Sequence, residues 1–230
     1  MLLWLTDYLS DFVRAFSVFQ YLTLRSMVSA MTALLLSLII GPIFIEKLSR
    51  QQIGQRVRLD GPESHLAKDG TPTMGGGLII VVITIATLFW GDLSNRYIWL
   101  VLSVTCAFGL IGWLDDYLKI LRQNSDGLSA RWKIFWQTIV ALSASSYLYT
   151  TADMAIQTDL IVPFFKEVAL PLGIGFIVFS SLMLVGMSNA VNLTDGLDGL
   201  AILPTVMVGG GLGLIAYLVG NSEYSTYLQI

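Results

Sequence analysis

The segment Tyr-Ile-Trp-Leu-Val-Leu-Ser-Val-Thr-Cys-Ala-Phe-Gly-Leu-Ile-Gly-Trp-Leu-Asp-Asp, residues 97–116, joins 18 uncharged residues to a terminal pair of carboxylates. As a helix rising about 1.5 Å per residue, the uncharged part reaches roughly 27 Å, close to the thickness of a bilayer core. Two charges at the end of such a segment are costly near lipid. We therefore expect a transmembrane helix whose Asp115 and Asp116 are held at a polar cavity or a metal.

The rest of the chain repeats this apolar pattern. Hydrophobic residues make up 55% of it and charged residues only 13%, where a soluble domain carries about 25%. The runs are continuous rather than alternating, which favours helices over a barrel. We predict an all-α, polytopic membrane protein with about six transmembrane helices in one domain, residues 1–230. The six uncharged runs are residues 26–45, 70–91, 97–114, 134–152, 168–194 and 199–222.

The N-terminal stretch, residues 1–22, mixes apolar side chains with Asp7, Asp11 and Arg14. This mixture predicts an amphipathic or interfacial helix. The stretch has neither the basic start nor the small-residue cleavage site of a signal peptide. The net charge of -3 indicates no nucleic-acid partner.

Lys and Arg are distributed unevenly among the gaps between runs, and cytoplasmic loops are enriched in both. The first and third gaps carry several, whereas the second has only Arg96 and the fourth only Lys166. The N-terminus is therefore expected outside, and Asp115 and Asp116 on the cytoplasmic face. The fifth gap, with Asp195 and Asp198, is expected on that same face.

Spacing suggests what the acidic pair does. Asp115 and Asp116 precede Lys119 by four and three residues, so a helix continuing past the membrane surface would align them on one face. Carboxylates there can bind Mg2+, which takes one or two of them plus substrate phosphate oxygens. The alternative is ordinary interfacial charge with i,i+4 pairing, which would explain Lys119 equally well. Two adjacent negative charges repel, however, and so favour a metal or a shared proton.

A second acidic cluster lies in Asn-Leu-Thr-Asp-Gly-Leu-Asp-Gly-Leu, residues 192–200. Asn192, Asp195 and Asp198 recur every three residues, which places them on one face of a helical turn. A helix cap and a glycine turn would explain one of these aspartates but not both. The stretch from Gly70 to Gly77 either cradles phosphate beside Lys68 or packs one helix against another, and it lacks P-loop spacing.

Taken together, residues 71–76 (Thr-Pro-Thr-Met-Gly-Gly), 112–117 (Gly-Trp-Leu-Asp-Asp-Tyr) and 189–200 (Asn-Ala-Val-Asn-Leu-Thr-Asp-Gly-Leu-Asp-Gly-Leu) closely resemble the bacterial phospho-N-acetylmuramoyl-pentapeptide transferases. These belong to the polyprenyl-phosphate N-acetylhexosamine-1-phosphate transferase superfamily. The resemblance implies transfer of phospho-N-acetylmuramoyl-pentapeptide from UDP to undecaprenyl phosphate, with Mg2+, giving lipid I and UMP. It places the protein in the bacterial inner membrane, in peptidoglycan synthesis, and thereby in cell shape and division.

The resemblance also implies roles for particular residues. Asp115 and Asp116 match the acidic pair, as catalytic residues and candidate Mg2+ ligands. One of them is the favoured base for the lipid phosphate, and attack by an aspartate through a covalent phospho-enzyme stays open. The nucleoside-side pocket matches Asn192, Asp195, Gly196, Leu197 and Asp198, and phosphate or uridine contacts match Lys68, Thr73, Lys119 and Lys133.

Relatives in this family have about ten spans, with a histidine-rich loop and a further essential aspartate, associated with Mg2+, beyond the sixth. The resemblance therefore implies that this additional metal ligand would lie beyond Ile230, the last residue of the sequence. We expect the chain to be C-terminally incomplete relative to the family, and the 230 residues alone not to make lipid I. Whether the protein forms a homodimer is left open, as are its partners beyond substrates and membrane lipids.

Three other functions compete with this one. A CDP-alcohol phosphotransferase would need an Ala-Arg pair after its first Asp-Gly, whereas Leu197 and Asp198 follow Asp195-Gly196 here. A transferase for another UDP-sugar is closer. An ion-coupled transporter would place its carboxylates near the midplane of the spans, whereas all four aspartates are expected at one rim.

Overall fold

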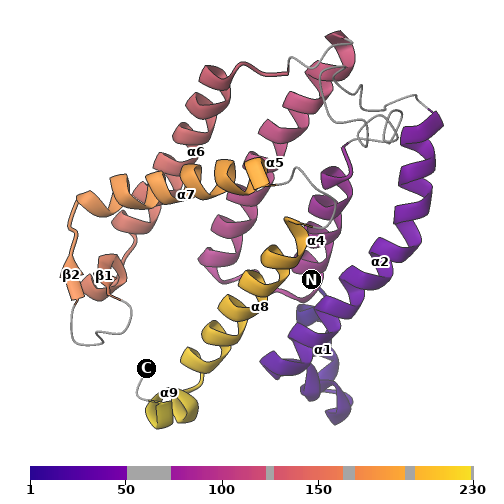
Figure 1. Ribbon diagram of the computed structural model, residues 1–230. Coiled ribbons are helices and arrows are strands. Elements are labelled where there is room, and N and C mark those ends of the chain that lie inside the picture. Colours follow the sequence, from indigo (N-terminus) through magenta and orange to yellow (C-terminus); the bar gives the residue numbers. More distant parts are fainter. Residues whose placement is uncertain (51–73, 123–126, 163–168, 195–199, 229–230) are drawn as a thin grey trace.

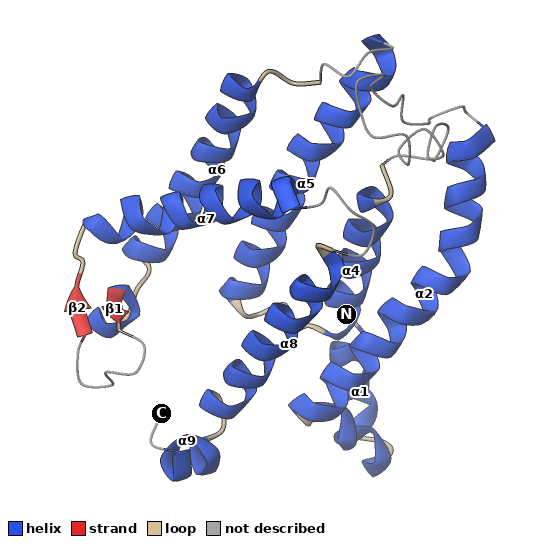
Figure 2. Cartoon of the chain, viewed as in Figure 1, coloured by secondary structure: helices blue, strands red, loops and turns tan. Residues whose placement is uncertain are grey.

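The computed structural model describes residues 1–50, 74–122, 127–162, 169–194 and 200–228. These residues form helices joined by short turns, with one two-stranded hairpin (Figures 1 and 2). Four helices lie side by side in alternating directions, and α7 (Gly175–Thr194) runs across the last of them. The four are α2 (Leu22–Arg50), α4 (Gly76–Trp90), α5 (Arg96–Arg122) and α6 (Ala130–Thr150). The predicted all-α class is confirmed.

Each of the six apolar runs contains a helix, and four described helices are long and apolar enough to cross a membrane. These four are α2, α5 up to Leu121, α7 and α8 (Ile202–Val219). The apolar helix α4 has 15 residues, about 22 Å at 1.5 Å per residue. Helix α6 has 21 residues, with Arg131, Lys133 and Gln137 in its first two turns. The polytopic architecture is thus confirmed, while the count of six spans stays a prediction.

Close packing joins α2 to α4. A Cβ atom added at Gly41 of α2 would lie 3.7 Å from the Leu78 side chain of α4, an ordinary van der Waals distance that places the two helices in contact there. Farther along, the Trp90 indole nitrogen donates a hydrogen bond to the Thr32 hydroxyl at 2.9 Å. Residue numbers fall along α2 between these two contacts while they rise along α4, so the two helices run antiparallel.

A similar seam joins α4 to α5. A Cβ at Gly109 would collide with the Cδ1 atom of Ile80, which fills the space that the glycine leaves. One turn away, the Thr84 hydroxyl lies 3.6 Å from the Cys106 sulfur. Cys106 therefore acts as a small packing residue at this seam.

Helices α6 and α7 make the most extensive helix contact in the described chain, and polar pairs fix its register. The Ser181 hydroxyl donates to the Ser145 hydroxyl at 3.3 Å, and the Asn189 amide donates to the Gln137 side chain at 2.7 Å. Along α7 the second contact comes eight residues after the first, whereas along α6 it comes eight residues before it. The two helices therefore run in opposite directions where they cross. The same register places fully buried Ala141 midway between the two pairs.

Two sequence expectations were wrong in their boundaries. The run over residues 168–194 is not one helix, because Ala169–Pro171 forms β2, which pairs antiparallel with β1 (Asp159–Ile161). Pro171 has no N–H to donate to a helix, and Gly173 adopts a left-handed φ of 51°. The helix therefore begins at Gly175. A short 3-10 turn, η2 (Ala155–Thr158), precedes the hairpin.

The N-terminal stretch is likewise divided, into α1 (Leu2–Ser10) and the 3-10 helix η1 (Arg14–Gln20). The break includes Val13, whose backbone is extended at φ -135° and ψ 107°. Exposed aromatic side chains on this stretch suit an interfacial position, as predicted.

The last described helices stand apart from the others. No residue of α8 is buried, and the short α9 (Ser222–Leu228) follows it. A hydrogen bond of 2.8 Å between the Tyr217 and Thr23 hydroxyls links the end of α8 to the start of α2.

The packing of α6 on α7 generates a prediction. Ala141→Leu should lower the free energy of unfolding by about 1–3 kcal/mol, because the larger side chain has no space between the two polar pairs. Thermal unfolding in detergent measures the change. Ser143→Leu is the matched control, since Ser143 is exposed two positions away on the same helix. Equal unfolding midpoints for the two variants would contradict this packing.

Candidate functional site

The C-terminal end of α5 carries the acidic pair. The helix continues past Asp115 and Asp116 to Arg122, as the sequence predicted. The Asp115 side chain is only 14% exposed, whereas that of Asp116 is 39% exposed. The two neighbouring carboxylates therefore lie in different surroundings, which sequence alone does not separate.

Lys119 connects the two carboxylates. Its ammonium nitrogen lies 2.8 Å from Asp115 Oδ2 and 2.9 Å from Asp116 Oδ1. The predicted three- and four-residue spacings are thus confirmed as ion pairs. One cation between two anions reduces the repulsion that adjacent aspartates would otherwise suffer.

The chain that leads into α6 closes over Asp115. The backbone N–H of Leu128 donates to Asp115 Oδ1 at 2.7 Å. A Cβ at Gly127 would collide with that same oxygen and would lie 2.8 Å from Lys119 Cε. The absence of a side chain at Gly127 is what lets this segment approach, because the carboxylate and the lysine already fill the space.

The two aspartates differ in how many of their carboxylate oxygens have a hydrogen-bond or ion-pair partner. Both oxygens of Asp115 have a partner, one the Leu128 N–H and the other Lys119. Asp116 shares one oxygen with Lys119, and among the described residues its other oxygen has no hydrogen bond or ion pair. Asp115 is thus held by the protein, and Asp116 has an oxygen available for a ligand.

Further positive charge lies near the pair. Lys133, in the first turn of α6, is partly exposed and interacts favourably with the charge of Asp115. The predicted phosphate contacts Lys119 and Lys133 are therefore brought to the same end of the fold. Lys119 is occupied by carboxylates, whereas Lys133 makes no side-chain hydrogen bond within the described chain.

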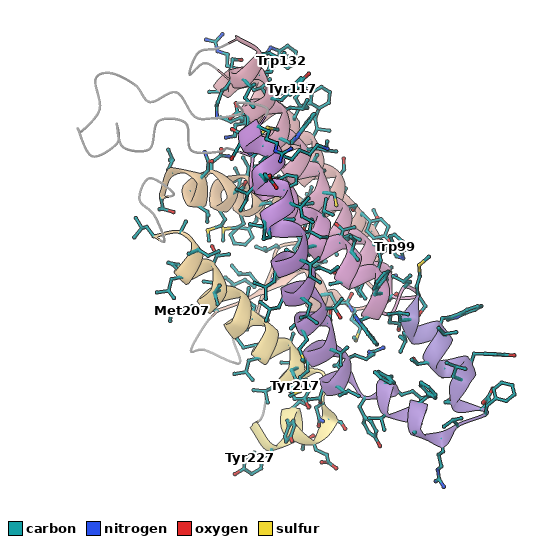
Figure 3. All side chains as sticks on the ribbon, turned by 90° about the vertical axis from the view of Figure 1, so that its right-hand side faces the viewer. Trp99, Tyr117, Trp132, Met207, Tyr217 and Tyr227 are labelled. Atoms are coloured by element: carbon teal, nitrogen blue, oxygen red, sulfur yellow. The ribbon has the colours of Figure 1, made fainter. Side chains whose placement is uncertain are left out.

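Aromatic side chains mark the two ends of the helices. Trp113 and Tyr117 stack with ring centroids 5.1 Å apart, next to the acidic pair. Tyr117 and Trp132 lie at one end of the molecule, and Tyr217 and Tyr227 lie at the other (Figure 3). Trp and Tyr concentrate where membrane meets water, so these rings favour a boundary position for the acidic pair over the midplane, and that position stays a prediction.

The second acidic cluster is described only in part. Asn192 is exposed in the last turn of α7, and Asn189, one turn earlier, is anchored to buried Gln137. The Asn189 amide also donates to the Val185 carbonyl. The remaining predicted site residues lie outside the described residues, so the meeting of the two clusters stays a prediction. They are Lys68, Thr73, Asp195, Gly196, Leu197 and Asp198.

The glycine stretch before α4 shows packing as well as an opening. Helix α4 begins at Gly76, and a Cβ at Gly77 would lie 3.8 Å from the Phe44 ring. Gly75 and Gly76 face open space, and Met74 adopts a left-handed φ of 72°. Helix packing, the alternative weighed from the sequence, brings Gly77 into ordinary contact with Phe44 but does not require a glycine there.

The described residues do not by themselves form a metal site, and the predicted Mg2+ stays a prediction. No group of three His, Cys, Asp or Glu side chains converges within the described ranges. Mg2+ needs only one or two protein carboxylates when substrate phosphates supply other ligands, and the available Asp116 oxygen fits that requirement. The described residues end at residue 228, so they do not reach Ile230. The further metal ligand that the resemblance implies beyond Ile230 is therefore outside them as well. That ligand stays a prediction.

The contact at Gly127 can be tested. Gly127→Ala should lower turnover of the full-length enzyme by about 10- to 100-fold, because the added methyl displaces the Asp115 carboxylate or Lys119. Gly186→Ala is the control, since a Cβ there meets nothing within 4 Å. Equal losses in the two variants, measured on protein inserted to the same level, would contradict the role of Gly127.

Comparison with known families identifies the family of the chain. The family model for glycosyl transferase family 4 matches residues 98–230, more than half of the chain. The match covers the acidic pair, Lys119 and the second acidic cluster. The chain therefore belongs to glycosyl transferase family 4, whose general activity is the transfer of a sugar phosphate to a polyprenyl phosphate.

Proposed function

We propose that the protein transfers phospho-N-acetylmuramoyl-pentapeptide from its UDP carrier to undecaprenyl phosphate, forming lipid I and UMP. The observation that carries the proposal is the Lys119-bridged pair, Asp115 and Asp116, at the boundary end of a membrane span. Family membership supports the general reaction. The muramoyl donor is supported by the three motifs, at residues 71–76, 112–117 and 189–200.

The location of the pair suits substrates of opposite solubility. A charged nucleotide sugar approaches from water, while a polyprenyl phosphate has its chain in the bilayer and its phosphate at the surface. The end of α5 is reachable from both sides, since Asp116 is partly exposed and exposed apolar residues such as Leu114 and Leu121 lie nearby. An ion-coupled transporter has less support, because its carboxylates would be needed deeper in the membrane.

The chemistry exchanges one diphosphate linkage for another. An oxygen of the lipid phosphate attacks the phosphorus bonded to the sugar, and the bond from that phosphorus to the oxygen of UMP breaks. The lipid phosphate needs little help as a nucleophile near pH 7, because the second pKa of a phosphate monoester is about 6. Positioning and charge neutralisation therefore contribute more than proton removal.

The roles of the two aspartates follow from their partners. Asp115 orients Lys119 and binds the segment before α6, so it positions the site. Asp116 offers its available oxygen to the reacting phosphates or to Mg2+, which when bound would neutralise the charge of the diphosphate. We favour direct attack over a covalent phospho-enzyme, since Lys119 pairs with both carboxylates and makes them weaker nucleophiles.

Cations and the second cluster complete the proposed site. Lys133 contacts a phosphate, with Lys68 and Thr73 as further phosphate or uridine contacts. Asn192, exposed in the last turn of α7, belongs to the nucleoside-side pocket. The other members proposed for that pocket are Asp195, Gly196, Leu197 and Asp198.

Substitution of the acidic pair tests the proposal. Asp116→Asn and Asp115→Asn should each lower lipid I synthesis by the full-length enzyme at least about 100-fold, because each removes a charge that aligns or neutralises the reacting phosphates. Labelled lipid I extracted from the membrane gives the rate. Asp153→Asn is the control, since that exposed carboxylate pairs with Arg96 at the other end of α5.

Full activity of both variants would contradict the proposed site.

The two aspartate variants should also differ in how their activity depends on Mg2+. With saturating donor, a higher Mg2+ concentration should partly restore the activity of Asp115→Asn and leave Asp116→Asn inactive. The reason is that, of the two aspartates, Asp116 has the oxygen available for the metal. The reverse pattern would exchange the two proposed roles.

A further inference from the structure

A cavity of about 670 Å³ lies at the end of the fold opposite the acidic pair. It is enclosed by α1, the end of η1, the first turn of α2 and the turn between α4 and α5. Asp92 in that turn precedes Asp115 by 23 residues, most of them in α5. The helix alone separates the two ends by roughly 28 Å, at 1.5 Å for each of the 19 residues from Arg96 to Asp115. The cavity is therefore distinct from the proposed transferase site.

One polar group in this cavity lacks a partner. The Nε atom of Arg25 is buried, and no hydrogen-bond acceptor within the described chain lies within its reach. The Arg25 side chain is partly exposed at the cavity and makes no hydrogen bond within the described chain, so a ligand with acceptor oxygens can reach its terminal N–H groups. Arginine pairs best with flat or multi-oxygen anions, of which phosphate is the common one at a membrane surface.

Two carboxylates line the same cavity. Asp7 accepts a hydrogen bond from the Gln20 amide at 2.9 Å, and Asp92 accepts two from Ser94, at 2.6 and 3.0 Å. The hydroxyl and backbone N–H of Ser94 hold the pKa of Asp92 below its usual range, so it is ionised at neutral pH. In both aspartates these bonds use Oδ1, which leaves Oδ2 for another donor. The charge of Arg25 also helps to lower the pKa of Asp92, so the cavity holds one cationic side chain and two carboxylates close together, a pattern complementary to a zwitterion.

The surroundings indicate that the ligand comes from the bilayer. Trp4 at the cavity is 86% exposed, and Tyr8 and Phe12 on the same stretch are exposed as well. Exposed aromatic side chains on a short amphipathic helix lie at the membrane–water boundary, where lipid head groups are. The volume falls within the range of about 300–1,000 Å³ that is usual for small-molecule sites.

We propose that this cavity binds the zwitterionic head group of a phosphatidylethanolamine-type lipid. The lipid phosphate accepts from Arg25, its ammonium donates to Asp7 and Asp92, and its acyl chains pass along the exposed apolar face of α1. The proposal does not depend on the transferase reaction, and its failure would leave that reaction untouched.

Lipid titration of the purified full-length protein, followed by native mass spectrometry, tests this site. The wild type should retain phosphatidylethanolamine in preference to phosphatidylcholine and phosphatidylglycerol of the same chains. Arg25→Gln should raise the apparent dissociation constant by about tenfold, through loss of a charged hydrogen bond. Arg14→Gln is the matched control, since Arg14 is an exposed cation at the same end. Equal effects of the two variants would overturn the proposal.

A second variant tests the ammonium contact without removing the arginine. Asp7→Asn keeps an acceptor for Gln20 but removes the charge, so the preference for phosphatidylethanolamine over phosphatidylglycerol should narrow while total lipid binding stays near that of the wild type. An unchanged preference would overturn the head-group assignment. Displacement of the lipid by inorganic phosphate at millimolar concentration would instead identify a soluble anion as the ligand and overturn the lipid source.

Discussion

The charge of Asp115 is the constraint on which the described part of the site depends. A carboxylate only 14% exposed at the end of a membrane span requires compensation, and the protein supplies it from both sides. Lys119 neutralises one oxygen, and the Leu128 N–H binds the other. The second contact ties the end of α5 to the start of α6, so the electrostatic requirement of one side chain also sets how two helices meet.

This arrangement leaves Asp116 as the chemically available member of the pair. It lies beside the stacked rings of Trp113 and Tyr117, and the proposed function requires a nucleotide from water and a lipid phosphate to meet there. Lys133 adds positive charge from the neighbouring helix. Membership of glycosyl transferase family 4 supports transfer of a sugar phosphate, a reaction that needs neutralised, aligned phosphates.

The positions of the helices and the ion pairs at the end of α5 could be predicted from sequence, because both depend on the spacing of residues close together in the chain. The apolar runs predicted where helices form, and the three- and four-residue spacings predicted both ion pairs of Lys119. What sequence missed depends on how distant segments meet. The Leu128 contact requires the chain to return after α5, and the pairing of Asn189 with Gln137 requires the register of α7 on α6. Composition alone also extended the fifth run through Pro171, where backbone geometry forbids a helix.

The most direct measurement of the central claim is the balance of products from the full-length enzyme in lipid vesicles with Mg2+. Supplied with UDP-N-acetylmuramoyl-pentapeptide and undecaprenyl phosphate together, it should release UMP and lipid I in equal amounts, and neither product when one substrate is omitted. UDP-N-acetylglucosamine should not replace the muramoyl donor. UMP released without the acceptor, or a lipid product formed only from another UDP-sugar, would contradict the account.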